Sequence, residues 1–116
     1  MIDGIGIDVV DIKRFHESLE RTPGLREKLF TESERTLNES SLAARFAAKE
    51  AVAKSLGGPA GLSWHDVIVH TDLSGKPSLE ITGAALQLAN SMAVSRWHIS
   101  LTHEGGHSIA YVIAES

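Results

Sequence analysis

Two carboxylates and a lysine in this chain have the types and spacing of a site that binds a metal ion beside a phosphate. Asp8 stands in an otherwise apolar segment, where a carboxylate is costly unless it is paired or bound to a cation. Phe46, Glu50 and Lys54 are spaced by four residues, so a helix would place them on one stripe. If Asp8 meets Glu50, their oxygens suit Mg²⁺, which takes its other ligands from water and phosphates.

Each of these residues also has a structural interpretation, and the pattern alone leaves both interpretations open. Asp8 would then cap a neighbouring element, and Glu50 would form a weak ion pair with Lys54 on a solvated helix face. In the functional interpretation, cations bind the phosphates, and the candidates are Arg45, Lys49, Lys54 and Lys76. Neither a P-loop motif nor a Gly-x-Gly-x-x-Gly motif occurs, which disfavours an ordinary ATPase or dinucleotide-binding fold.

The histidines give a weaker signal. His103 lies at the end of an expected strand, where a phosphate-contacting role and a structural role are both open. His103 and His107 form a His-x-x-x-His pair, but Gly105 and Gly106 between them predict a turn. The helical zinc signature is therefore not met, and no third ligand is evident.

Asp8 falls on the first expected strand, from Ile2 to Val10. Gly4 and Gly6 share its face of the strand, and we expect them to open space there for a ligand. Glu50 and Lys54 fall on the strongest helix, which opens at Ser40 and runs to about Leu56. That helix ends at the breaker sequence Gly57-Gly58-Pro59.

Caps and turn residues predict the remaining elements. Asp11 is the expected N-cap of a helix that ends by Thr22, and Thr31 with Glu34 fits a capping box ahead of a short helix. The other expected elements are strands at Val67–Thr71, Ser78–Thr82, Trp97–Thr102 and Ser108–Ala114, and a helix from about Gly83 to Met92. The order predicts an α+β fold, a single domain over residues 1–116 with an antiparallel sheet packed on the long helix.

Composition narrows the class of protein. The chain has 116 residues and no cysteine, which excludes disulfides, thiolate metal sites and cysteine nucleophiles. Its formal net charge of −4 argues against broad nucleic-acid binding. No apolar run spans a membrane and the N-terminus has no signal-peptide pattern, so we expect a cytoplasmic protein. The last strand is apolar on both faces, which suggests contact with a neighbouring subunit.

Three segments, taken together in this order and spacing, are far more specific than any one of them. They are Gly4 to Ile12, Arg45 to Lys54, and Ser100 to Glu104. With them the chain closely resembles the holo-[acyl-carrier-protein] synthases, the small bacterial type of 4′-phosphopantetheinyl transferase. The resemblance covers nearly the whole chain.

The resemblance implies an activity and an assembly. The family moves the 4′-phosphopantetheine arm of coenzyme A onto a serine of apo acyl carrier protein and releases adenosine 3′,5′-bisphosphate, in support of fatty acid biosynthesis. The carrier is a small free protein or a domain of a fatty-acid synthase. The family is typically a homotrimer with its active sites between subunits.

The resemblance also implies roles for individual residues. Asp8 and Glu50 match the Mg²⁺ ligands, and Lys54 matches a residue near the pyrophosphate that is a candidate proton donor to the leaving phosphate. Arg45 and His103 match positions that contact the 3′-phosphate of the coenzyme. Further matches are Gly75, Lys76 and Pro77 along the nucleotide site, and Arg14 at the carrier.

Other interpretations remain open on sequence grounds. The chain is alternatively a non-catalytic module that binds coenzyme A or a carrier, or a coenzyme A hydrolase that uses the same metal. For the transferase, the base that takes the serine proton is either a metal-bound water or Glu50. Transfer of this kind depends mainly on positioning and charge neutralisation rather than on covalent help from the protein.

Overall fold

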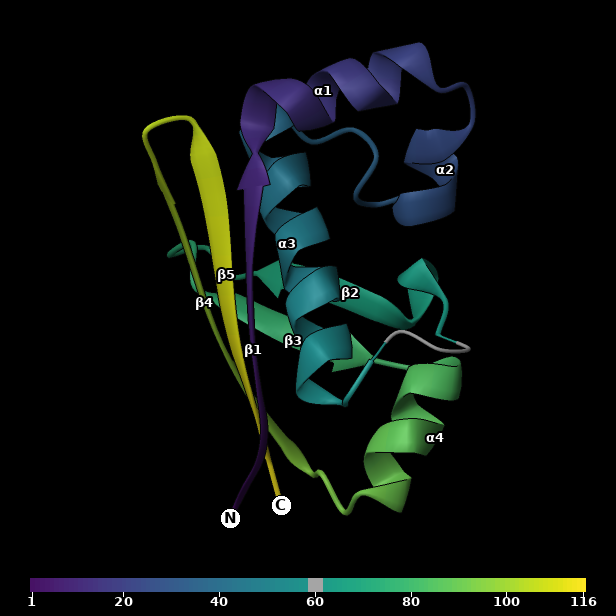
Figure 1. Ribbon diagram of the computed structural model, residues 1–116, viewed down its shortest axis with the longest axis vertical. Coiled ribbons are helices and arrows are strands. Elements are labelled where there is room, and N and C mark those ends of the chain that lie inside the picture. Colours follow the sequence, from purple (N-terminus) through teal and green to yellow (C-terminus); the bar gives the residue numbers. More distant parts are fainter. Residues whose placement is uncertain (59–61) are drawn as a thin grey trace.

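One long helix, α3 (Glu39–Ser55), packs against one face of a sheet of three long strands in the computed structural model (Figure 1). The sheet consists of β1 (Ile2–Asp11), β5 (His107–Glu115) and β4 (Arg96–Glu104), in the order β1-β5-β4, with both pairs antiparallel. The structure describes residues 1–58 and 62–116, so Pro59, expected just after the helix, lies outside the described residues.

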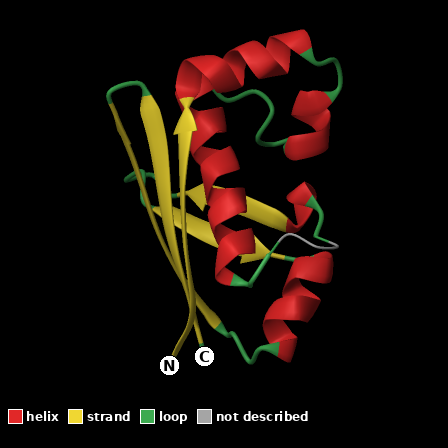
Figure 2. Cartoon of the chain, viewed as in Figure 1, coloured by secondary structure: helices red, strands yellow, loops and turns green. Residues whose placement is uncertain are grey.

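Smaller helices and a second sheet complete the domain (Figure 2). Helices α1 (Ile12–Arg21) and α2 (Leu25–Leu29) cover one end of α3, and α4 (Gly83–Ser91) lies near the other. The second sheet pairs β2 (Val67–Thr71) with β3 (Pro77–Ile81) and follows a short 3₁₀ helix at Trp64–Asp66. The expected α+β class, with antiparallel strands on a long helix, is confirmed. No helix in the described ranges is long and apolar enough to cross a membrane.

Side-chain caps define the N-termini of α1, which follows the strand of Asp8, and of α3, which carries Glu50. The Asp11 carboxylate accepts a hydrogen bond from the Arg14 backbone amide at 2.9 Å, so the predicted N-cap of α1 is confirmed. Helix α3 begins at Glu39, slightly earlier than expected, because the Asn38 side chain accepts from the Ser41 amide at 2.9 Å.

The capping box is only partly correct. Glu34 does reach back, since its Oε1 accepts a hydrogen bond from the Thr31 backbone amide at 3.0 Å. No helix follows Thr31, however, and the short helix of this region is α2, which ends at Leu29. Glu34 is instead a buried residue (2% exposed), and its carboxylate accepts a hydrogen bond from the ammonium group of Lys49 on α3.

Gly4 and Gly6 of β1 have a packing role instead of the expected role of opening space for a ligand. A Cβ atom on Gly4 would collide with the carbonyl oxygen of Ser55, and one on Gly6 would collide with that of Ala51. Both collisions are with the backbone of α3, so the glycines let the helix lie directly on the strand. The expected open space for a ligand beside these glycines is therefore wrong, because α3 fills it.

The hairpin between β4 and β5 is tighter than expected. The connection is only Gly105 and Gly106, with φ of 56° and 81°, which is the left-handed backbone that a two-residue hairpin turn requires. His103 therefore belongs to β4 and pairs with Ser108, rather than to the connection.

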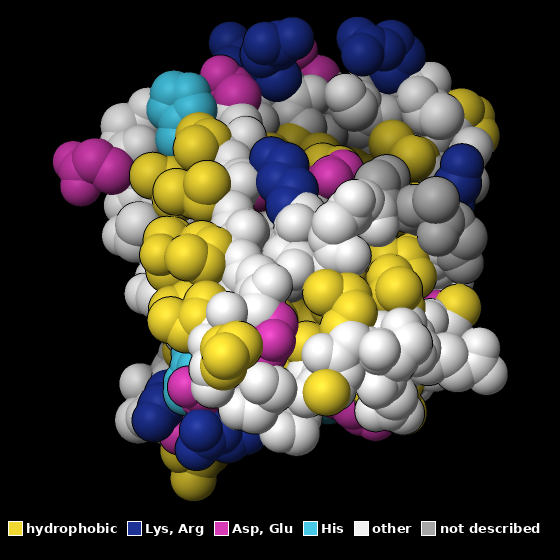
Figure 3. Space-filling view, turned by 60° about the horizontal axis from the view of Figure 1, so that its bottom comes forward, with side chains coloured by type: hydrophobic (Ala, Val, Ile, Leu, Met, Phe, Trp, Pro, Cys, Tyr) yellow, Lys and Arg dark blue, Asp and Glu magenta, His cyan; other side chains and the backbone are white. Residues whose placement is uncertain are grey.

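The two faces of the sheet differ in what covers them. Ala110, Val112 and Ala114 of β5 are fully buried on the face that meets α3. The opposite face of the sheet is apolar over β1 and β5 and uncovered in the single chain, whereas β4 contributes His98, Ser100 and Thr102 to it; we call its apolar part the outer face. Its residues are Ile5, Ile7, Val9, Ile109, Tyr111 and Ile113, which the register pairs across β1 and β5. Hydrophobic side chains form a column along one side of the molecule in Figure 3.

Candidate functional site

Asp8, Glu50 and Lys54 line one cleft between β1, α1 and α3. The cleft has a volume of about 430 Å³, and Phe46 also lines it. The spacing of four along α3 therefore puts Phe46, Glu50 and Lys54 on one stripe, as expected, and that stripe faces the strand that carries Asp8. The β1–α1 junction supplies the remaining wall, with Asp11, Arg14, Phe15 and Ser18.

Lys54 binds the strand rather than its own helix neighbour. Its Nζ lies 3.0 Å from Asp8 Oδ1 and donates to the carbonyl oxygen of Ile7, also at 3.0 Å. The lysine side chain is 53% exposed, whereas that of Asp8 is only 17% exposed. The alternative in which Lys54 pairs with Glu50 on a solvated face is therefore wrong for this structure.

The two carboxylates affect each other electrostatically. Burial raises the pKa of Glu50 above its ordinary value, the negative charge of Asp8 raises it further, and Lys54 partly offsets both effects. Two acidic groups that oppose each other's ionisation are stabilised by a cation between them.

This donor set fits a hard divalent cation. Within the described part of the chain there is no cluster of three or more side chains that could hold a metal ion. A cation at Asp8 and Glu50 would thus take its remaining ligands from water and from a substrate, which is how Mg²⁺ is commonly held beside phosphates.

Arg45 and His103 line a second hollow, on another side of α3. This hollow has a volume of about 190 Å³ and lies between the start of α3 and β4, with Ser41 and Thr102 among its lining residues. Arg45 precedes Glu50 by five residues, which is about 140° around the helix axis. Burial lowers the pKa of Arg45, and the negative charge of Glu34 counteracts that effect.

The Gly75-Lys76-Pro77 segment lies in a third place. Gly75 has a φ of 87° in the turn before β3, and Lys76 and Pro77 line a hollow of about 490 Å³ that also includes Trp97 and His98 of β4. Within one chain the candidate residues thus fall into two groups. Asp8, Glu50, Lys54 and Arg14 meet beside β1, while Arg45, His103, Lys76 and Pro77 line two hollows along β4, and Gly75 lies in the turn next to Lys76.

One candidate cation is not available to a phosphate. Lys49 is 2% exposed, and its ammonium group is fully engaged with Glu34 and two backbone carbonyls. The expectation that Lys49 supplies charge to a phosphate is therefore wrong.

Sequence reasoning placed Phe46 beside Glu50 and Lys54 but missed Phe15, the other aromatic residue of the cleft. Phe15 of α1 stacks on Phe46 with ring centroids 4.8 Å apart, and both rings line the cleft of Asp8 and Glu50. The signal that could have found Phe15 is the apolar spacing of Ile12, Phe15 and Leu19 along α1. Ser18, three residues after Phe15, is on the same face.

Comparisons with known proteins agree over the full length of the chain. A family model described as the 4′-phosphopantetheinyl transferase superfamily matches residues 4–112. The chain is 57% identical over 115 residues to a protein of Arthrobacter sp. (strain FB24) named holo-[acyl-carrier-protein] synthase, and the match covers 99% of each chain.

Solved structures of proteins with the same name have the same fold. The holo-[acyl-carrier-protein] synthase of Neisseria meningitidis matches with a TM-score of 0.84 and 31% identity over 100% of each chain. That of Helicobacter pylori, in complex with coenzyme A, matches with a TM-score of 0.84 and 28% identity, over 96% of this chain and 99% of that one.

Proposed function

This chain belongs to the 4′-phosphopantetheinyl transferase superfamily, and from that premise we propose that it is a holo-[acyl-carrier-protein] synthase. It transfers the 4′-phosphopantetheine group of coenzyme A to a serine of an apo acyl carrier protein. The serine oxygen forms a new bond to the β-phosphorus of coenzyme A. The bond from that phosphorus to the bridging oxygen breaks, and adenosine 3′,5′-bisphosphate leaves. The proton of the serine hydroxyl passes to a base, for which Glu50 and a water are the two candidates.

The observation that carries the proposal is the meeting of Asp8, Glu50 and Lys54 in one cleft. We assign Asp8 and Glu50 as ligands of a Mg²⁺ ion, which when bound would neutralise charge on the pyrophosphate and polarise its phosphorus. Lys54 lines the same cleft, and its side chain is exposed enough for the ammonium group to turn from Asp8 to a phosphate oxygen. There it would protonate the leaving group.

The remaining candidate residues have roles in binding the two substrates. Arg45 and His103 bind the 3′-phosphate of coenzyme A, and Gly75, Lys76 and Pro77 border its nucleotide. Arg14, on the α1 side of the cleft, contacts the acidic carrier. The reaction supplies holo carrier for fatty acid biosynthesis in the cytoplasm.

Mass spectrometry of the carrier tests the proposed reaction. The protein is incubated with apo carrier, coenzyme A and Mg²⁺, and the carrier is expected to gain the mass of one phosphopantetheine. Tight binding of coenzyme A without any gain would indicate a non-catalytic module. Release of adenosine bisphosphate in reactions that lack the carrier would indicate a hydrolase.

We also propose that the protein works as a homotrimer with each site between two subunits. The two groups of candidate residues lie on different sides of α3, so one chain does not bring them together. A neighbouring copy seated on the outer face would cover the apolar side chains of β1 and β5. It would also supply the group along β4 to the cleft of Asp8 and Glu50.

A charge on the outer face is expected to dissociate the assembly. Tyr111 is 40% exposed on the central strand of that face, and burying a carboxylate there without a partner is costly. We expect Tyr111→Glu to raise the subunit dissociation constant by about 30-fold or more. Light scattering measures the mass, and the transfer assay should lose activity at the same protein concentrations.

Leu86→Glu is the matched control for this experiment, because Leu86 is 41% exposed but lies on α4, away from the outer face. It should leave mass and activity unchanged. An assembly that survives Tyr111→Glu and falls apart with Leu86→Glu would place the contact elsewhere.

A further inference from the structure

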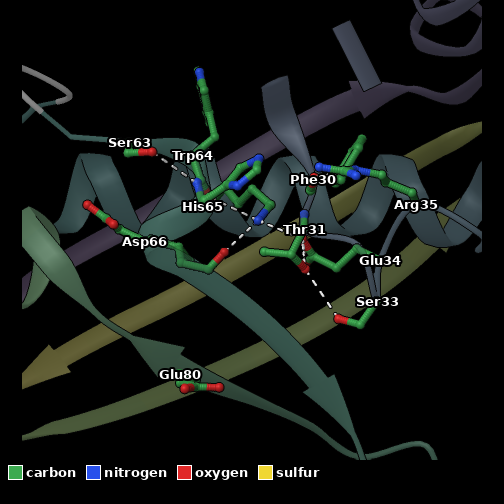
Figure 4. Close-up of polar contacts among 12 residues, drawn as sticks. Phe30, Thr31, Ser33, Glu34, Arg35, Ser63, Trp64, His65, Asp66 and Glu80 are labelled. Carbon is green, nitrogen blue, oxygen red and sulfur yellow. Dashed lines mark hydrogen bonds and ion pairs between the residues drawn. The ribbon is translucent and has the colours of Figure 1, made fainter. Parts of the chain in front are cut away.

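The ammonium group of Lys49 joins three parts of the chain. It donates to Glu34 Oε1 at 3.0 Å, to the carbonyl oxygen of Trp64 at 3.0 Å and to that of Val67 at 2.5 Å. Glu34 lies in the segment before α3, and the two carbonyls lie in the 3₁₀ helix and at the start of β2. Figure 4 shows how the segments around Glu34 and Trp64 approach each other beside the helix.

Such a buried pair is a poor source of stability by itself. The side chains of Lys49 and Glu34 are 1% and 2% exposed, and burial lowers the pKa of the lysine despite the nearby carboxylate. Apolar residues of the same volume often stabilise a fold at least as well as a buried ion pair. The role of Lys49 is therefore better inferred from the segments that its three hydrogen bonds join than from the charge of the ion pair.

From Trp64 a chain of aromatic contacts leads to the cleft. The Trp64 ring packs against Phe46 with centroids 5.4 Å apart, and Phe46 stacks on Phe15 at 4.8 Å. Phe30, next to Thr31, makes a T-shaped contact with Phe15, with ring centroids 6.1 Å apart. We call Phe15 and Phe46, which both line the cleft of Asp8 and Glu50, the aromatic wall.

We propose that Lys49 is a positioning residue that holds the aromatic wall in place through its hydrogen bond to the Trp64 carbonyl. Through Phe15 the wall reaches α1, beside Arg14 and Ser18, which is the side where the carrier approaches under the proposed function. Lys49 does not contact either substrate, because it is only 2% exposed and does not line the cleft. Loss of its bond to Trp64 should impair use of the carrier more than use of coenzyme A.

Two variants separate the carbonyl bonds from the ion pair. Glu34→Gln removes the carboxylate charge but keeps an oxygen that accepts from the Thr31 amide, and even a neutral lysine amine retains two hydrogens for the two carbonyls. Lys49→Met in the Glu34→Gln background also removes the amine, so neither member of the Lys49–Glu34 pair is left as an unpaired charge, and the effect of losing the Glu34 charge on Arg45 is common to both proteins. The two proteins thus differ only at the side chain that reaches Trp64 and Val67.

The two variants should differ in the KM for the carrier but not in the KM for coenzyme A. The double variant is expected to raise the KM for the carrier by about tenfold or more, since small displacements near a site have large effects. Its KM for coenzyme A should stay within about twofold of that of Glu34→Gln. Val94→Ala, a core truncation at a residue that does not line the cleft, shows what loss of stability alone does to both constants.

The fluorescence of Trp64, which packs against Phe46 of the wall, tests the same contact without any enzymatic reaction. The sequence holds two tryptophans, so Trp97→Phe leaves Trp64 as the single indole. In that background we expect the emission of Trp64 to shift to longer wavelength in the double variant, and to stay at the wild-type position in Glu34→Gln.

Equal carrier KM and equal emission in the double variant and Glu34→Gln would overturn the proposal, whatever their stability. A loss of carrier use in Val94→Ala as large as in the double variant would also overturn it, because general destabilisation would then explain the effect. Wild-type protein that never modifies a carrier would instead count against the proposed function, and the fluorescence comparison would still test the role of Lys49.

Discussion

Glu50→Gln is expected to lower the rate of phosphopantetheine transfer by about a thousandfold or more, while the protein stays folded. The change keeps the size of the side chain and removes the charge that holds the cation with Asp8. A bound metal ion contributes several kcal/mol to stabilising charge in a transition state of this kind. Transfer is measured from the mass of the carrier, and metal binding by calorimetry with Mg²⁺ and coenzyme A.

The structure gives this experiment two internal checks. Because burial and Asp8 raise the pKa of Glu50, the neutral variant should be at least as stable as the wild type in thermal unfolding. Glu80→Gln removes an exposed carboxylate from β3 and should leave transfer near the wild-type rate. A Glu50→Gln protein with wild-type activity would refute the assignment of Glu50 as a ligand.

Gly6→Ala is expected to have the largest effect on stability. The added Cβ would collide with the Ala51 carbonyl, which is backbone in the middle of α3 and has no rotamer to change. The helix would have to move off the strand, and with it the packing of Ala47, Ala48 and Val52. We expect a loss of about 4 kcal/mol or more in the free energy of unfolding, measured by denaturant titration.

Gly24→Ala distinguishes this steric effect from the general cost of replacing glycine. Gly24 has a φ of 83°, but a Cβ added there would meet no atom within 4 Å, so only backbone strain opposes alanine. That strain costs about 1–2 kcal/mol. If Gly6→Ala proved no more destabilising than Gly24→Ala, the close contact of α3 with β1 would not be the reason for glycine.

Local signals predicted the frame of the domain well. The cap at Asp11, the alternation along β1 and the spacing of Phe46, Glu50 and Lys54 each depend on residues close in sequence, and each agrees with the structure. The α+β class follows from the order of such elements. The family also followed from sequence, because three motifs in one order are more specific than any single one.

The predictions failed where a residue depends on a partner far away in sequence. Glu34 looked like a helix cap because Thr31 is three residues away, but its main partner is 15 residues further on, at Lys49. Gly4 and Gly6 looked like open space because the helix that fills it belongs to another segment. Roles of the site residues stay predictions until the variants are measured, although the geometry brings Asp8, Glu50 and Lys54 together.

The position of Arg45 and Glu50 on different sides of one helix has a genetic consequence. Under the proposed assembly, a subunit with a faulty Glu50 still lends an intact Arg45 to its neighbour, and the reverse holds for a subunit with a faulty Arg45. Two alleles that are each inactive alone would therefore complement each other when expressed together. Random mixing in equal amounts would restore about one quarter of the sites.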